Sequence, residues 1–132
     1  MPIAVERDLR RNWMIARATG PLALSDVLTF IQTVRVPQEV RMWPLLFDAR
    51  LATTGITEAE VLEAANAVGE VVRRSGPRGH VALVAEDDQL YQRMLLYEAA
   101  CGDLGVRVIR VFRQYGDAEQ WLEIVSAARH FH

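Results

Sequence analysis

Two short apolar segments, each followed by a polar turn and an amphipathic stretch, dominate the hydrophobic pattern of this chain. They are Trp43–Arg50 (WPLLFDAR) and His80–Glu86 (HVALVAE). A strand in a sheet that is covered on both faces reads as a continuous apolar run, whereas a strand with one wet face alternates polar and apolar residues. The pattern therefore predicts an α/β fold whose central strands are buried on both sides.

Three further strands are predicted. Ile3–Arg7 and Trp13–Thr19 are rich in strand-forming residues, and the charged segment Asp8–Asn12 between them predicts a hairpin. Gly20 and Pro21 are expected to end the second of these strands. Val106–Phe112 alternates arginine with aliphatic residues, which is typical of an outer strand with one wet face.

Helical spacing and capping residues predict four helices. The first has apolar residues from Leu24 to Val34, with Ser25 or Asp26 as its cap and Pro37 beyond its end. After a polar loop over 51–56, the second begins at the capping box of Thr57 and Glu60 and runs to about residue 74. Asp87 or Asp88 caps the third, and Asp117 with Gln120 caps the last, which buries its tryptophan.

The resulting order is ββαβαβαβα. A front hairpin followed by right-handed crossovers gives a mixed five-strand sheet with four helices packed around it. The chain has 132 residues, of which 51% are hydrophobic and 24% charged, as in an ordinary globular protein. We expect one domain over residues 1–132.

All fifteen basic residues are arginine. Without a lysine amine, the chain lacks the groups of a phosphate loop ending in Gly-Lys, a Schiff-base enzyme or a typical response-regulator receiver. The formal net charge is −2 at pH 7, so no strong field attracts a phosphate backbone. Nucleic acid is not an expected partner.

Residues suited to catalysis or metal binding are sparse. Cys101 has apolar neighbours on a predicted helix, which indicates a buried thiol and a reducing compartment. His80, His130 and His132 show no metal-ligand spacing, and no Gly-x-Ser-x-Gly elbow is present. We expect a chain that is not an enzyme and needs no metal or cofactor.

No apolar stretch approaches the ~20 residues that span a bilayer. Charged residues near the start of the chain stand where a signal peptide has its apolar core. We expect a cytoplasmic protein with no integral membrane segment.

Four segments resemble the SpoIIAA-like group of the STAS family, the fold of anti-sigma-factor antagonists. They are 20–31 (GPLALSDVLTFI), 44–57 (PLLFDARLATTGIT), 80–99 (HVALVAEDDQLYQRMLLYEA) and the closing strand, turn and helix of 108–122. The likeness covers nearly the whole chain and implies a regulatory module that works by protein contact. In classical antagonists a partner kinase phosphorylates a serine or threonine at the start of the helix after the third strand, and the added charge breaks the contact.

Polar residues cluster at the end of the third predicted strand, where open α/β sheets bind ligands and partners. The candidates for partner binding or phosphorylation are Asp48, Arg50, Thr53, Thr54, Gly55 and Thr57. Asp48 bonding to loop amides and Thr57 serving as a cap are the structural alternatives. We expect this loop to contact a regulatory protein, or a second copy of the chain in a homodimer.

The third predicted helix has an apolar face wider than one sheet contact requires, and core packing is the simplest explanation. The alternative is a ligand or partner surface. Relatives in the same broad group resemble the lipid-carrying CRAL-TRIO fold, which implies a carrier or sensor of a small apolar ligand between helices and sheet. The candidate ligand or interface residues are Leu28, Phe30, Asp88, Tyr91, Met94 and Leu95.

Overall fold

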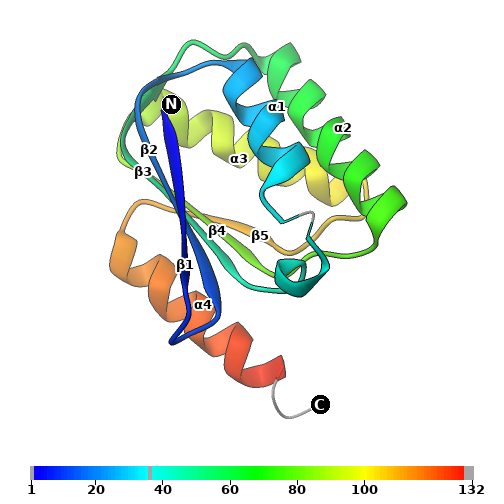
Figure 1. The fold of residues 1–132 in the computed structure, drawn as a ribbon. Coiled ribbons are helices and arrows are strands. Elements are labelled where there is room, and N and C mark those ends of the chain that lie inside the picture. The colour runs from blue at the N-terminus through cyan, green and yellow to red at the C-terminus, as the bar shows by residue number, and fades with distance from the viewer. Residues whose placement is uncertain (1, 36, 130–132) are drawn as a thin grey trace.

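The computed structural model of the chain describes residues 2–35 and 37–129, so His130 and His132 lie outside the described residues. The predicted order of strands and helices is confirmed (Figure 1). The elements are β1 (Ile3–Asp8), β2 (Trp13–Leu22), α1 (Leu24–Thr33), a short 3-10 helix η1 (Gln38–Val40), β3 (Leu45–Thr54), α2 (Glu58–Ser75), β4 (Val81–Ala85), α3 (Asp88–Asp103), β5 (Ile109–Phe112) and α4 (Tyr115–Arg129).

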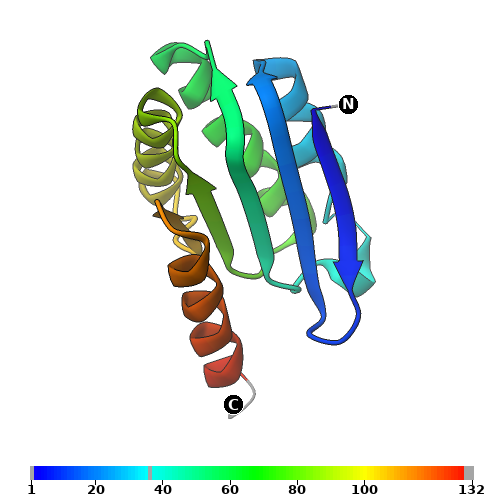
Figure 2. The ribbon, with the colours of Figure 1, turned by 90° about the vertical axis from the view of Figure 1, so that its left-hand side faces the viewer.

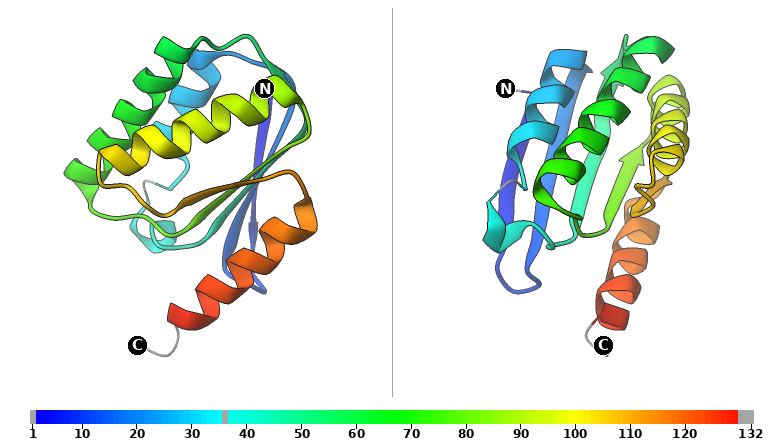
Figure 3. Two further views of the ribbon diagram at one scale, coloured as in Figure 1. Left: turned by 180° about the vertical axis from the view of Figure 1, so that it is seen from behind. Right: turned by 90° about the vertical axis from the view of Figure 1, so that its right-hand side faces the viewer.

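The five strands lie in chain order, β1-β2-β3-β4-β5, with β1 antiparallel to β2 and the other pairs parallel. Because each parallel strand lies next to the one before it, right-handed crossovers place every connecting helix on the same face of the sheet. Figures 1 and 3 show α1, α2 and α3 together on that face. Helix α4, which follows the last strand, lies on the other face.

The sheet separates two hydrophobic cores. The larger lies between the sheet and α1–α3, and the smaller lies under α4, where Leu46 and Leu122 are completely buried. All five residues of β4 are buried, as are the first five of β3, so the prediction that these strands are covered on both faces is confirmed. Figure 2 shows that α4 leaves β1 and the upper ends of β2 and β3 without a helix over them.

The predicted ends of β2 and β3 are wrong. β2 continues through Gly20 and Pro21, and the segment 51–54, predicted as a polar loop, is the end of β3. Residues 19–22 pair with 51–54, so the two extensions support each other. Pairing with β1 stops at Ala18, so β2 is an edge strand at Pro21, where a residue without an N–H is tolerated. Gly20 has φ +69°, a conformation that glycine adopts without a steric cost.

Two of the four predicted helix starts are confirmed. Thr57 and Glu60 form a reciprocal capping box at α2, with backbone-to-side-chain hydrogen bonds of 2.9 and 3.2 Å. Asp87 caps α3 by accepting a 2.9 Å hydrogen bond from the Leu90 N–H. These caps satisfy backbone donors that have no partner within the helix.

The other two helix starts differ from the prediction. Ala23 is the N-cap of α1, and Asp26 binds back to the Ala23 N–H at 3.0 Å. α4 begins at Tyr115, which puts Asp117 in its first turn and not at its cap. The outer strand is also shorter than predicted, because β5 begins at Ile109.

Candidate functional site

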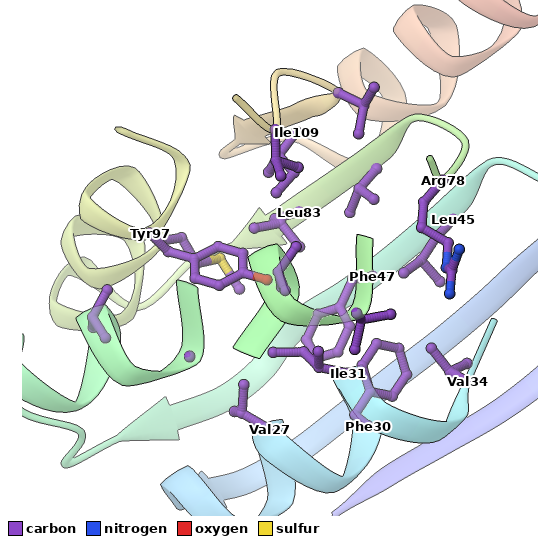
Figure 4. Close-up of a pocket in the computed structure, with 18 of the residues that line it drawn as sticks. Val27, Phe30, Ile31, Val34, Leu45, Phe47, Arg78, Leu83, Tyr97 and Ile109 are labelled. Atoms are coloured by element: carbon purple, nitrogen blue, oxygen red, sulfur yellow. The ribbon is translucent and has the colours of Figure 1, made fainter. Parts of the chain in front are cut away.

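An apolar cavity of about 230 Å³ lies between the sheet and helices α1, α2 and α3 (Figure 4). Phe30 and Phe47 meet edge to face in its wall, with their ring centroids 5.2 Å apart. The buried face of α2 consists of small residues, namely Val61, Ala64, Ala65 and Gly69. Side chains of this size do not fill the space between three helices and a sheet.

The cavity includes part of the predicted ligand face. Phe30 and Met94 line it, whereas Leu28, Tyr91, Leu95 and Asp88 are not among its lining residues. Asp88 instead pairs with Arg113 at 2.7 Å on the surface, and the same arginine lies 4.0 Å from the centre of the Tyr91 ring. The wide apolar face of α3 therefore divides into a cavity wall and a separate surface cluster.

Four arginines that sequence reasoning missed also line the cavity, and two of them, Arg35 and Arg78, are buried. Arg35 is 7% exposed, and its Nη1 donates to the carbonyl oxygens of Trp43 at 2.8 Å and Gly79 at 2.9 Å. Burial and the nearby positive charge of Arg78 lower the pKa of Arg35 to about 10, so it is still charged at neutral pH.

Arg78 is 8% exposed and lies in the turn before β4. Its Nη1 donates to the Gly76 carbonyl oxygen at 2.8 Å, while its Nη2 is buried and has no hydrogen-bond partner among the described residues. Burial and the positive charge of Arg41 lower the pKa of Arg78. No aspartate or glutamate in the described chain forms an ion pair with Arg35 or Arg78.

Tyr97 contributes a neutral polar group to the cavity. Its ring reaches in from α3 (Figure 4), and its hydroxyl hydrogen-bonds the Cys101 thiol. Burial and this neighbour raise the pKa of Tyr97 well above its usual value, and burial raises the pKa of Cys101 to about 11. Both groups are therefore uncharged at neutral pH, and the thiol is a poor nucleophile.

Asp48 and Arg50 form a bidentate ion pair within β3, on the face that carries α4. Both nitrogen-to-oxygen distances are 2.9 Å, and the Arg50 guanidinium lies 4.5 Å from the centre of the Tyr115 ring. Burial alone would raise the pKa of Asp48, but the hydrogen bonds from Arg50 outweigh it and lower this pKa. The Asp48 carboxylate is therefore ionised and already paired.

The sequence matches no family model and no curated protein. A solved structure does match: a protein of the DUF3478 family from Shewanella loihica PV-4, described as having a SpoIIAA-like fold. The two chains are 16% identical, the alignment covers 91% of each, and the TM-score is 0.53. This chain has a SpoIIAA-like fold. The resemblance found in the sequence is thus confirmed at the level of the fold.

Within this SpoIIAA-like fold, the predicted candidates after Asp48 have different surroundings. Thr53 and Gly55 are exposed. Thr54 is buried and donates its hydroxyl to the Leu22 carbonyl oxygen at 2.9 Å, and Thr57 serves as the helix cap. Because β3 runs to Thr54, the connection to α2 consists of residues 55–57 only.

Two features are absent from the described residues of the SpoIIAA-like fold. None of the helices in the described part of the chain has both the length and the apolar character needed to cross a membrane. Nor does that part bring together three or more histidine, cysteine, aspartate or glutamate side chains in a group able to hold a metal ion.

Proposed function

We propose that this chain is a non-catalytic regulatory or binding module that holds a small apolar ligand in the cavity between α1–α3 and the sheet. The observation that carries the proposal is the cavity itself, about 230 Å³ with walls that are mainly aliphatic and aromatic. An engineered apolar cavity of about 150 Å³ is already large enough to bind benzene. The natural ligand is therefore expected to be somewhat larger than benzene.

The exposure of the lining residues supports entry of a ligand from one side of the cavity. Most of its lining is buried or half-buried, but Pro77, Gly105 and Arg107 are exposed. These three residues, which we call the mouth, lie on the segments that lead into β4 and β5. A ligand that enters there moves between the sheet and the helices without crossing a strand. Binding sites of this kind are usually formed before the ligand arrives.

Filling the cavity is expected to abolish binding while the fold is kept. Ala64 is 4% exposed and lines the cavity from α2, so Ala64→Phe places a ring in the space that the ligand needs. Titration with the neutral fluorescent probe N-phenyl-1-naphthylamine is expected to show one site in the natural protein. The affinity of Ala64→Phe is expected to fall at least about tenfold, with no loss in melting temperature.

Ala59→Phe is the matched control, because it makes the same substitution at an exposed position of α2. It is expected to bind the probe as the natural protein does. The proposal would be overturned if the natural protein did not bind the probe, or if no lipid-like compound appeared in its native mass spectrum. Equal affinities for Ala64→Phe and Ala59→Phe would overturn it as well.

A second candidate function is contact between two copies of the chain at the end of β3. The observation in its favour is Leu51, whose exposed fraction of 76% is unusual for a large apolar residue in a strand. Leu51 pairs with Thr19 in the part of the β2–β3 ribbon that lies beyond the last β4 pairing, at Ala49. The predicted candidate Thr53 is exposed on the same ribbon.

We expect sedimentation equilibrium to show a dimer that Leu51→Asp converts to a monomer, because a buried charge in the contact is costly. Leu9→Asp is the control, since Leu9 is 74% exposed in the hairpin turn before β2, whereas Leu51 pairs with Thr19 in the second half of β2. A natural protein that remains monomeric at high concentration rules this candidate out.

A further inference from the structure

Two buried arginines have no paired carboxylate among the described residues of this structure. Arg35 and Arg78 are each more than nine-tenths buried, and no carboxylate of the described chain pairs with either of them. Buried charges in proteins are normally paired, because removing an ion from water carries a large free-energy cost. Here the two positive charges also oppose each other, and each faces the same cavity. The arrangement lacks a negative charge.

Arg78 has an unused hydrogen-bond donor in the wall of the cavity. Its Nη2 is buried and unpartnered within the described chain. Figure 4 shows the Arg78 guanidinium beside Leu45 at the margin of the cavity. A guanidinium is planar and presents paired N–H groups that match the two oxygens of a carboxylate or phosphate.

Arg35 and Arg78 lie near each other at one end of a mainly apolar space. Arg78 follows Pro77, a residue of the mouth, and Arg35 binds the carbonyl oxygen of Gly79. Elsewhere the walls are mainly apolar, and the polar group of Tyr97 is uncharged and already bonded to Cys101. Arg93 also lines the cavity, but its Nε donates to the Ile56 carbonyl oxygen at 2.8 Å and its Nη1 lies 3.9 Å from Glu58. The charged part of a ligand therefore fits near the mouth, with its apolar part in the interior.

We infer that the ligand is an amphipathic anion, whose carboxylate or phosphate head binds Arg35 and Arg78 and whose apolar body fills the cavity. This inference rests on the proposed function, because it names the chemical class of the ligand of the same cavity. It also explains why two arginines are buried there. Their desolvation is compensated when the ligand is bound, so the binding of the anion contributes to the stability of the folded chain.

The test compares probes that share one apolar body and differ in the head. The natural protein is titrated at neutral pH with decanoate, decyl phosphate and decanol, and binding is measured by isothermal titration calorimetry. At least one of the two anions is expected to bind at least about tenfold more tightly than decanol, and the tighter anion identifies the head group. Equal binding of all three overturns the inference and leaves the proposed function standing. If none of the three compounds binds, both the inference and the proposed function fail.

Substitution of the arginine assigns the effect to the site. Arg78→Met keeps an apolar stem of similar length and removes the unpartnered donor, so we expect it to fold. Its affinity for the anion is expected to fall at least about tenfold, while its affinity for decanol stays the same or rises. Arg74→Met, at an exposed arginine of α2, is the control and should leave both affinities unchanged. An Arg78→Met protein that keeps its full preference for the anion contradicts the assignment.

Discussion

Replacing Leu122 with alanine is expected to lower the free energy of unfolding by about 3–5 kcal/mol. Leu122 is completely buried in the core beneath α4, where it packs with residues such as Leu46 and Val84. The alanine side chain leaves a cavity that the surrounding strands fill only in part, since β3 and β4 are fixed by pairing on both sides. The expected loss is large because this core is small and is covered by one helix, so Leu122 supplies a large share of its buried apolar surface.

Chemical denaturation followed by circular dichroism measures this loss. Ile124→Ala is the matched control, because Ile124 lies two residues away on α4 and is 60% exposed. The control is expected to change the free energy of unfolding by no more than about 0.5 kcal/mol. Similar losses in the two variants would mean that α4 does not pack on the sheet through the face that contains Leu122.

The order of the elements could be predicted because each signal for it is local. Apolar runs marked the buried strands, and the side chains of Thr57 and Asp87 marked the starts of two helices by bonding to backbone N–H groups three residues away. The ends of β2 and β3 could not be predicted in this way. Thr19–Leu22 and Leu51–Thr54 are strands because they pair with each other, and neither segment shows its partner in its own sequence.

The candidate site was predicted less well than the fold, for the same reason. The cavity depends on how closely three helices approach the sheet, and that distance depends on residues distant from one another in the chain. Arg35 did carry a signal: it lies just beyond α1 but continues the four-residue spacing of Val27 and Ile31, which line the cavity from α1. Arg78 lies in a turn between a proline and a glycine, where an arginine normally indicates only an exposed loop.

The last large effect is expected at Gly79, which follows Arg78 and whose carbonyl oxygen accepts a hydrogen bond from Arg35. An added Cβ at Gly79 would lie 2.3 Å from the Met42 carbonyl oxygen and 2.8 Å from that of Trp43, both of them backbone atoms. The segment has little freedom to move away, because the carbonyl oxygens of Trp43 and Gly79 accept hydrogen bonds from the same Arg35 nitrogen. The Gly79 N–H also donates to the Arg41 carbonyl oxygen at 3.2 Å.

Gly79→Ala is therefore expected to lower the free energy of unfolding by about 2–3 kcal/mol, as overpacking of a fixed segment does. Gly102→Ala is the control: Gly102 lies in α3 with open space around its Cα, and an alanine there should be neutral or stabilise the helix by about 0.5–1 kcal/mol. Denaturation of both variants measures the difference.

A titration with the tighter-binding of the two anions, decanoate or decyl phosphate, then tests the arginine site. Because the collision displaces the carbonyl oxygens that hold Arg35, Gly79→Ala should lose affinity for the anion at temperatures where it is still folded, whereas Gly102→Ala should not. Full stability in Gly79→Ala would show that the turn before β4 is not packed against residues 42–43, and full affinity would show that Arg35 does not need these carbonyl oxygens to bind the head group.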